Sequence, residues 1–512
     1  MPVSYNHISP STRLPLFWAE IDPSQAGTFQ NYQRALVLGY KTAAAPATAN
    51  ALVRVSSPDQ AKALFGRGSQ GAGMFEAWFK NNTFDEVWGI AIAEPGAGVA
   101  ATGSIEVTGT ATASGILSLY ISGRRVQVGV TAGDTKSAIA TAIAAAINAN
   151  VDLPVTAAVI DDADDDTVAL TAKWKGIDSN GIDVRVNYLG QIGGEALPAG
   201  VTLTITAMAS GTGNPDLTSA LAAIGDQEFD TVVIGWNDAT TLNAVDLEWS
   251  HVGDVGRWSW LRQLFGHVYS AKDGTVGDLQ TFGQTRNGAH ITCFGYRGSP
   301  TPFWERAAMF AAQAHRALMN DPARPLHTLP LNGMLPAIIS QRFTKGEKNS
   351  LAFDAISVCK ETEDGVCQIE TSFSMYQKNT HGLDDNAFLK VQTLATLAYV
   401  LRSLRYRIVQ KFPRHKLAND GTRYGPGQAI VTPKVAKAVI VAHYRELEYL
   451  GLVENAEAFA ANLIVERNAN DPNRLDVLYP PDLVNQLDVF AVLAQFRLQY
   501  PAQLPDQALP IA

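Results

Sequence analysis

A regular alternation of short apolar runs and amphipathic segments between residues 216 and 320 constrains the fold of this chain most. Runs such as FDTVVIGW and AHITCFGY are apolar on both faces, as is typical of strands buried on both sides. Strands that alternate with helices in this way predict a largely parallel sheet covered on both faces. The expected strands are 229–236, 266–272 and 289–296, and the expected helices are 216–225, 242–264, 275–284 and 302–320.

The same α/β pattern begins earlier, in residues 34–92. Two buried-strand runs, RALVLGY and EVWGIAI, flank two predicted helices. The first helix has clear boundaries, because Ser57 suits the N-cap and Pro58 the first turn, and Gly66 suits the C-terminal stop. This stretch is therefore predicted to begin the α/β domain that residue 216 resumes.

Between residues 96 and 215 the composition changes to Gly, Ala, Thr, Ser and Asp. Short alternating runs such as SIEVTGT, RRVQVGV and VTLTITA predict strands joined by Gly-rich turns. One Ala-rich segment, TKSAIATAIAAAINAN, predicts a helix. Because the α/β pattern resumes afterwards, we expect a separate, mostly β domain inserted into the α/β domain.

Both ends of the chain carry candidate strands that could leave the body. The N-terminal run RLPLFWAEID is apolar on both alternating faces and contains Pro15, which suits an edge or an arm. Residues 489–500 follow the Pro480–Pro481 break and alternate like a strand with one apolar face. Exposed strands of this kind indicate directed pairing with another chain.

The fold class expected from these patterns is α/β and α+β: an α/β core with an inserted mostly β domain and extended strand arms at both termini. The last third should hold a hairpin at 355–374, helices at 386–412 and 433–450, and a strand at 456–468. The expected domains are 1–27 (N-terminal arm), 28–95 and 216–345 (α/β core), 96–215 (inserted domain), 346–485 (C-terminal domain) and 486–512 (C-terminal arm and tail).

Composition narrows the function. The 512 residues have a formal net charge of -9, which argues against a nucleic-acid binder, because phosphate neutralisation needs a basic face. No apolar run approaches the roughly 20 residues that span a bilayer, and no signal peptide is recognisable, so we expect a protein kept in a cytoplasm without membrane insertion. Cys293, Cys359 and Cys367 fit free thiols in a reducing compartment, although Cys359 and Cys367 flank a hairpin turn and could face each other.

The apparent motifs for catalysis and cofactor binding lack the sequence context that each function requires. GRGSQG matches the dinucleotide fingerprint, but a capped helix and not a strand precedes it, so we expect a turn between two helices. A subtilisin-like order of Asp273, His381 and serine fails, because Ser403, the only serine after His381, lies inside a predicted helix. The acidic run 161–166 lacks the glycine and distal glutamate of a calcium loop. We expect no catalytic, cofactor or metal site.

One concentrated basic cluster follows the apolar stripe of the predicted helix 386–412. Two interpretations remain open: cations that favour a helix C-terminus, or an electrostatic contact with an acidic partner of the same assembly. The cluster consists of Arg402, Arg405, Arg407, Lys411, Arg414 and Lys416.

Several segments together resemble the tail sheath proteins of contractile-tailed bacteriophages, most closely the Mu-like family. They are RLPLFWAEID, ALFGRGSQGAGMFEAWF, SGRRVQVGVTAGDTKSAIATAIAAAINAN and NDPNRLDVLYPPDLVNQLDVFAVLAQFRL. The last of these is the most specific. The family's subtilisin-like domain is an architectural label, and the missing serine argues against reading it as chemistry.

The resemblance implies a structural subunit that stacks as six-fold rings in a helix around a tail tube and contracts to drive the tube through the host envelope. The implied partners are the subunit itself, the tail tube protein, and baseplate and tail terminator proteins, without direct nucleic-acid contact or a cofactor. The implied location is the virion tail, assembled in the host cytoplasm. In this interpretation the basic cluster contacts the tube, and the residues of the inter-subunit arms are Leu14, Leu16, Phe17, Trp18, Phe490, Val492, Phe496 and Leu498.

Three alternatives remain at this point. The chain could be the sheath subunit of a phage-derived contractile injection system or bacteriocin, which has the same sequence features. It could be another virion protein, such as a baseplate or capsid subunit. An α/β enzyme with an atypical site is the third alternative.

Overall fold

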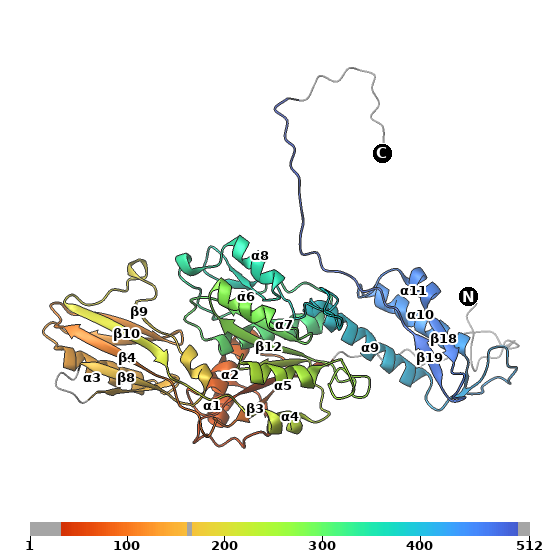
Figure 1. Ribbon diagram of the computed structural model, residues 1–512, viewed down its shortest axis with the longest axis horizontal. Helices are drawn as coiled ribbons and strands as arrows, with labels where there is room; N and C mark the ends of the chain where they lie inside the picture. The colour runs from red at the N-terminus through yellow and green to blue at the C-terminus, as the bar shows by residue number, and fades with distance from the viewer. Residues whose placement is uncertain (1–31, 161–165, 500–512) are drawn as a thin grey trace, which may run out of the picture.

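The structure is a computed structural model that describes residues 32–160 and 166–499. Its largest element is a six-stranded sheet in the order β13-β12-β11-β1-β3-β2 (Figure 1). All neighbouring strands are parallel except β2, which pairs antiparallel with β3. The predicted parallel sheet is therefore confirmed. Its strands are β1 (Ala35–Tyr40), β2 (Leu52–Val55), β3 (Val87–Ile92), β11 (Thr231–Ile234), β12 (His267–Asp273) and β13 (Ile291–Tyr296).

Helices connect these strands as the alternation predicts. Every residue of β1, β11 and β13 is buried, so helices must cover both faces of the sheet. The helices of this core are α1 (Pro58–Phe65), α2 (Gln70–Asn81), α4 (Thr218–Ile224), α5 (Ala239–Trp249), α6 (Val276–Gln284) and α7 (Phe303–Asn320).

The GRGSQG segment is a turn between two helices, as expected. The Ser57 hydroxyl accepts a hydrogen bond from the Gln60 amide and caps α1, and Gly66 ends it at φ +90°. A Cβ at Gly66 would lie 2.1 Å from the Thr42 hydroxyl oxygen, so glycine is required there by both conformation and space. The Ser69 hydroxyl then caps α2. The glycines therefore build a helix-to-helix turn.

The segment between β3 and α4 forms an antiparallel β-sandwich whose described residues include one α-helix, α3 (Lys136–Ala149). One of its sheets has the order β10-β4-β8-β7 and the other β6-β5-β9. The large sheet is thus built from strands that precede this segment in the sequence and strands that follow it. The strands are β4 (Thr102–Gly109), β5 (Gly115–Ile121), β6 (Arg124–Val130), β7 (Val155–Val159), β8 (Thr167–Ala172), β9 (Val184–Val186) and β10 (Val201–Ala209).

The C-terminal part contains a hairpin packed on the core and a separate small module (Figure 1). Residues of the module form a second hydrophobic cluster around Tyr444, Leu447 and Phe459. The elements are α8 (Lys345–Phe353), β14 (Cys359–Glu361), β15 (Cys367–Ile369), α9 (Val391–Lys411), β16 (Lys416–Leu417), β17 (Ile430–Val431), α10 (Pro433–Tyr449), α11 (Ala456–Asn462), β18 (Ile464–Arg467) and β19 (Leu475–Leu478).

Two of the expected elements were wrong. The predicted helix 242–264 ends at Trp249, because the Arg257 side chain folds the following chain back onto the α4–β11 turn and donates to the Gly225 carbonyl at 2.8 Å. The predicted strand 456–468 is a helix in its first half, as the Ala-rich run AEAFAAN favours. Only Ile464–Arg467 of that segment is a strand.

Candidate assembly surfaces

The C-terminal segment is exposed and carries no secondary structure in its described part, 489–499. Figure 1 shows it running away from the body. Phe490 is 81% exposed and Phe496 is 85% exposed, and Val492 and Leu498 are exposed as well. A segment with this many exposed apolar side chains needs a partner to bury them. The N-terminal candidates Leu14, Leu16, Phe17 and Trp18 lie outside the described residues.

The chain just before this segment is tied firmly to the C-terminal module. The Val484 amide donates to the Leu452 carbonyl at 3.2 Å, and the Asp482 amide donates to the Tyr444 hydroxyl at 3.0 Å. Asp488 forms an ion pair with Lys390. The body therefore holds the chain as far as Asp488, and the exposed apolar segment starts at the next residue.

Beside this anchor lies a small sheet with open edges. β18 and β19 pair antiparallel, from Ile464 opposite Leu478 to Arg467 opposite Leu475. No third strand joins them within the described residues. Ile464, Val477 and Leu478 are exposed. Since an isolated two-stranded sheet is only marginally stable in water and its edges expose unpaired amides and carbonyls, β18–β19 is a template for an added strand.

The six residues of the basic cluster do not form one exposed surface, because two of them are paired within the chain. Arg402 is buried between helix α9 and the core, with its guanidinium 2.7 Å from Glu228 Oε1 and 2.5 Å from Asp230 Oδ1. Burial opposes its charge, but these two carboxylates outweigh that effect and raise its pKa. Arg407 pairs with Glu446 of α10. Both side chains are thus engaged within the chain.

Four members of the cluster remain exposed: Arg405, Lys411, Arg414 and Lys416. The Lys416 ammonium donates to Gln428 Oε1 at 2.9 Å. The other three have no ion pair with the residues that the structure describes. These four cations near the end of α9 are therefore the part of the cluster that can reach an acidic partner.

Ser403, His443 and Glu446 lie close enough to resemble a catalytic triad. The Ser403 hydroxyl is 3.1 Å from His443 Nε2, and His443 Nδ1 is 3.5 Å from Glu446. However, Ser403 is buried inside α9, and its hydroxyl also lies in donating geometry to the Val400 carbonyl at 3.0 Å. Burial lowers the pKa of His443. This contact is a polar bridge between α9 and α10, as the position of Ser403 in a helix predicts.

The other features considered in the sequence are metal-binding side chains, membrane-spanning segments, the cysteines and the acidic run. Across the described ranges, no group of three or more His, Cys, Asp or Glu side chains is placed to hold a metal ion. None of the helices described is long and apolar enough to cross a membrane. Cys293, Cys359 and Cys367 are buried free thiols, as expected. The register places Cys359 opposite Ile369, and the Cys359 and Cys367 thiols lie in hydrogen-bonding contact. Of the acidic run, Asp166 pairs with Lys136 at 2.9 Å, and 161–165 lie outside the described residues.

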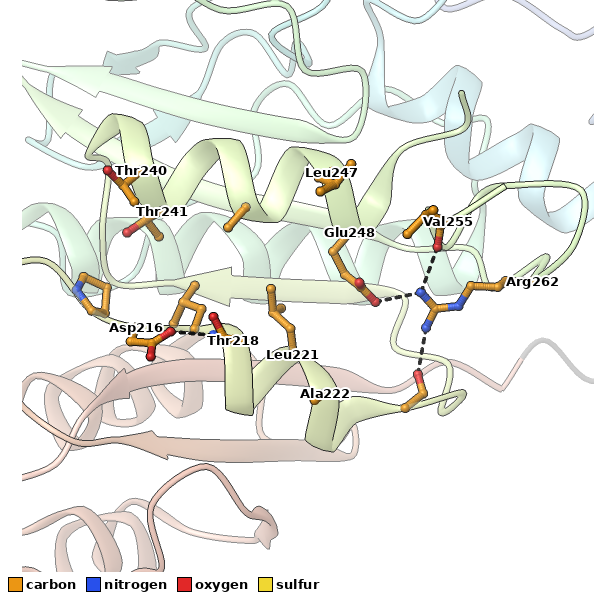
Figure 2. Close-up of a pocket in the computed structure, with 14 residues that line it drawn as sticks. Asp216, Thr218, Leu221, Ala222, Thr240, Thr241, Leu247, Glu248, Val255 and Arg262 are labelled. Atoms are coloured by element: carbon orange, nitrogen blue, oxygen red, sulfur yellow. Dashed lines mark hydrogen bonds and ion pairs between the residues drawn. The ribbon is translucent and has the colours of Figure 1, made fainter. Parts of the chain in front are cut away.

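A groove of about 550 Å³ opens between α4 and α5 (Figure 2). Its walls are mainly apolar, with Leu217, Leu221 and Leu247 among the lining residues. At one end Arg262 closes the groove, donating to Glu248 Oε1 at 2.9 Å and to the Gly225 carbonyl at 3.0 Å. The polar groups at this end are bound to one another, and the rest of the lining is mainly apolar.

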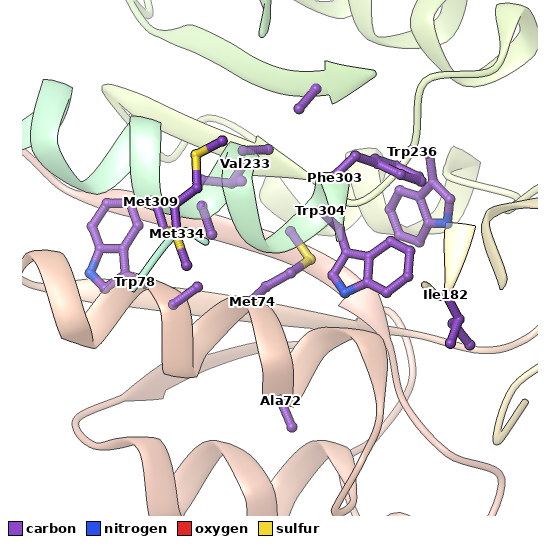
Figure 3. Close-up of a cluster of buried hydrophobic side chains, with 14 of the residues drawn as sticks. Ala72, Met74, Trp78, Ile182, Val233, Trp236, Phe303, Trp304, Met309 and Met334 are labelled. Atoms are coloured by element: carbon purple, nitrogen blue, oxygen red, sulfur yellow. The ribbon is translucent and has the colours of Figure 1, made fainter. Parts of the chain in front are cut away.

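A polar and aromatic network joins the β-sandwich to the core, next to the cluster of buried apolar side chains around Trp304 that Figure 3 shows. Trp174 of the sandwich packs edge-on against Trp304 of α7, with ring centroids 5.6 Å apart. Asp178 Oδ2 accepts hydrogen bonds from Trp174 Nε1 at 2.7 Å and from Gln70 Nε2 at 2.8 Å. Burial raises the pKa of Asp178 to about 7. Gln70 of the GRGSQG turn thus links α2 to the sandwich.

A second link is ionic. Arg124, at the start of β6, donates to Glu305 Oε1 of α7 at 2.8 Å and lies 3.4 Å from Glu76 Oε2 of α2. Burial raises the pKa of Glu305, and the Arg124 charge opposes that shift. The sandwich is therefore docked on the core by buried contacts that two helices share.

Comparison with known proteins gives three family matches along the chain. Residues 96–202 match the phage tail sheath protein β-sandwich domain, 210–375 the phage tail sheath protein central domain, and 384–497 the phage tail sheath C-terminal domain. The Mu-like prophage FluMu tail sheath protein of Haemophilus influenzae is 40% identical over 500 residues, which cover 97% of this chain and 100% of that protein.

Solved structures of lower similarity were also found. The contracted helical sheath of the anti-feeding prophage has a TM-score of 0.49 at 11% identity and covers 96% of this chain and 100% of that one. The sheath tail protein of Desulfitobacterium hafniense has a TM-score of 0.45 at 10% identity, with 92% and 100% covered. That of Listeria innocua has a TM-score of 0.45 at 12% identity, with 90% and 93% covered.

Proposed function

The chain belongs to the Mu-like phage tail sheath family, and we propose that it polymerises by adding its C-terminal segment as a strand to the β18–β19 sheet of a neighbouring subunit. It is a contractile tail sheath subunit, a structural component of the virion tail and not an enzyme. The predictions of family, function class and location are therefore confirmed. The α/β enzyme alternative is excluded by the family.

The observation that carries this proposal is that one chain contains both an unpaired segment that could add a strand and a small sheet with open edges that could accept one. The donor, 489–499, starts where the body releases the chain after Asp488. At about 3.3 Å per residue it can span roughly 35 Å, enough to reach a neighbouring subunit. The acceptor β18–β19 has unpaired edges within the described residues. Strand addition of this type gains its affinity from main-chain hydrogen bonds.

A single arm should bind weakly. Burying Phe490, Val492, Phe496 and Leu498 contributes roughly 1.5–3 kcal/mol per side chain. Ordering the backbone of 489–499 costs about 1–2 kcal/mol per residue, which in total exceeds what these four side chains contribute, so main-chain hydrogen bonds must supply the remainder. We therefore propose that the polymer depends on many arms acting together, and that the N-terminal arm with Leu14, Leu16, Phe17 and Trp18 contributes further strands. Head-to-tail contacts that do not close give a helical polymer. From the family resemblance we propose that this polymer consists of stacked rings of six subunits.

The arm is tested by deleting residues 489–512 or by replacing both Phe490 and Phe496 with Asp. Wild-type protein should form tubes or stacked rings in negative-stain electron microscopy, and both variants should remain folded and soluble without polymerising. The matched control is Ile192→Asp, which changes a fully exposed apolar residue of the sandwich. Normal tubes from the arm variants would rule out the role of this segment.

We further propose that the exposed cations of the basic cluster face the tail tube inside the sheath, with baseplate and tail terminator proteins at the two ends of the polymer. Support comes from the position of Arg405, Lys411 and Arg414, which have no acidic partner in the described chain. A contact of this kind steers and orients an acidic partner.

Arg405→Glu tests the tube contact, with Arg445→Glu on the exposed side of α10 as its control for the same charge change. The Arg405 variant should form fewer tube-filled sheaths than wild type while its thermal unfolding stays unchanged. Equal behaviour of the two variants would refute a specific tube contact at the end of α9.

A further inference from the structure

The outer edge of β19 offers hydrogen-bonding groups to an added strand. The Asn468 amide donates to the Arg474 carbonyl at 3.0 Å, and these two residues continue the register of β18 with β19. Hydrogen-bonded and non-hydrogen-bonded pairs alternate along an antiparallel ladder. The amides and carbonyls of Leu475 and Val477 therefore point away from β18, toward the open side of β19.

The edge of β18 is less accessible. Helix α10 packs against β18, and its Lys437 ammonium donates to the Leu463 carbonyl, just before the strand, at 2.7 Å. At the other end of β18, the Arg467 guanidinium donates to Asn419 Oδ1 at 2.9 Å. In the part of the chain that the structure describes, no helix or strand except β18 makes comparable contact with β19. An added strand therefore fits beside β19.

The two faces of this sheet have different surroundings. Val465 and Tyr479 pack on the hydrophobic cluster of the C-terminal module, so the face that carries Val477 is the core side. Val477 is nevertheless 40% exposed, since no further strand lies beyond β19 among the described residues. The opposite, outward face exposes Ile464 and Leu478 to solvent. A strand beside β19 would thus cover Val477 on the core side.

The outward face is apolar at one end and acidic at the other. Ile464 lies opposite Leu478 at the start of β18, and Glu466 lies opposite Asp476 nearer the hairpin turn. Arg474 Nε lies 2.5 Å from Asp476 Oδ1, whereas Glu466 is exposed and has no ion pair with another described residue. The hairpin end of this face is therefore net negative.

The donor segment 489–499 has a matching pattern. Its second face is apolar in the first half and polar in the second half, and Arg497 is the only charged residue of the segment. All of its described side chains are exposed. The first face is apolar throughout and consists of Phe490, Val492, Ala494, Phe496 and Leu498.

We infer that Arg497 of one subunit lies opposite Asp476 and near Glu466 of a neighbouring subunit, so that the donor runs antiparallel to β19 in a single register. This direction brings the polar half of the donor to the acidic end of the outward face and leaves its apolar half toward Leu478. Opposite charges across strands favour this arrangement over the reverse direction. The inference rests on the proposed strand addition, and it specifies the edge, the direction and the register.

The same register matches the apolar side chains. Phe496 lies opposite Val477 and Leu498 opposite Leu475, so the apolar face of the donor covers the core side of the sheet. A slip by one residue would turn Phe496 to solvent and place Arg497 against the hydrophobic cluster. Burial therefore selects which face of the donor points inward, and the charge of Arg497 selects the direction.

Charge reversal tests the role of Arg497. Arg497→Glu and Glu466→Lys should each raise the protein concentration needed for tube formation by about fivefold, because each replaces an opposite-charge pair across strands with a like-charge pair. The protein with both changes should recover most of this loss. Glu106→Lys, at an exposed position of the sandwich, is the matched control and should leave that concentration unchanged. A double variant at least as impaired as the single variants would contradict the pairing.

A cross-link tests the register itself. Gln495 should lie opposite Leu478 in a non-hydrogen-bonded pair, where Cα atoms are about 4.5 Å apart, a separation that a disulfide spans. Leu478→Cys combined with Gln495→Cys should therefore link neighbouring chains when tubes are oxidised in air. Leu478→Cys with Val489→Cys is the control and should not, since its second thiol lies about 20 Å further along the donor. Wild type should not cross-link either, because its three cysteines are buried.

The outcomes separate this inference from the proposed function. A disulfide from the control pair, or from neither pair while hydrogen exchange of 489–499 is slowed in tubes, would overturn the register and leave strand addition standing. Tubes in which 489–499 exchanges as fast as in unassembled subunits would overturn the proposed strand addition, and this inference with it.

Discussion

The two ends of the core are built in different ways. The β-sandwich is attached by a buried network in which Arg124, Asp178 and Trp174 each contact core helices or their side chains. The C-terminal module has its own small hydrophobic cluster and is joined to the core mainly along α9, where Arg402 binds Glu228 and Asp230. The sandwich should therefore move with the core as one body, while the arm-carrying module is stabilised separately.

This difference suits a subunit whose contacts must survive contraction. A rigid core and sandwich can rotate as a unit, and the anchored module with its free segment can keep neighbouring subunits linked. Three substitutions test whether the two attachments differ in strength as described.

The largest effect is expected at the sandwich. Arg124→Ala should lower the free energy of unfolding by about 3–5 kcal/mol, because it leaves the buried Glu305 carboxylate without its partner. Urea unfolding followed by tryptophan fluorescence measures this change. Arg124→Met with Glu305→Gln removes both charges and should recover most of the loss; a double variant as unstable as Arg124→Ala would show that packing, not charge, dominates there.

The buried Asp178 should make stability depend on pH. Its pKa is about 7 in the folded protein, against about 3.9 in an unfolded chain, so the folded state binds the proton more tightly. The free energy of unfolding should then fall as pH rises from about 4 to 7 and stay reduced above 7. The total change in the free energy of unfolding over this pH range should be on the order of 2–4 kcal/mol. Asp178→Asn keeps an acceptor for Trp174 and Gln70 and should remove this pH dependence.

Unfolding of wild type and Asp178→Asn at pH 4.5 and pH 8, values spanning about that pKa range, checks this prediction. The variant should gain stability over wild type at the higher pH. A constant difference between the two proteins at both pH values would mean that Asp178 is ionised in the folded protein throughout.

The smallest effect is expected at the C-terminal joint. Arg402→Ala removes the ion pair with Glu228 and Asp230, but these carboxylates still accept from the Phe265 and Arg34 amides, so the expected loss is about 1.5–3 kcal/mol in total. Hydrogen exchange should accelerate in α9 and the module, with little change in β11 or the sandwich. Uniform acceleration across the whole chain would show that the module and core unfold as one unit.

Periodicity was sufficient to predict the parallel sheet, the β-rich segment and the helix-to-helix turn at GRGSQG, because those features depend on local pattern and on glycine at Gly66. The predicted helix 242–264 was wrong because a contact between residues far apart in sequence decides the structure there. The segment after Trp249 has the spacing of an amphipathic helix, but Arg257 ties it to Gly225, 32 residues earlier.

The same limit applies to the assembly surfaces. Arg402 and Arg407 have no acidic neighbour in sequence, and their partners lie 174 and 39 residues away. The exposure of residues 489–499 agrees with the alternation after the Pro-Pro break, which is a local signal, whereas the predicted strand is absent from the described segment and stays a prediction for the polymer.

Hydrogen exchange of residues 489–499 in assembled tubes tests the strand-addition account most directly. If this segment joins the β18–β19 sheet of a neighbour, its amides should exchange at least about a hundredfold more slowly in tubes than in unassembled subunits, since strand pairing protects them. Fast exchange of the segment in well-formed tubes would contradict the account.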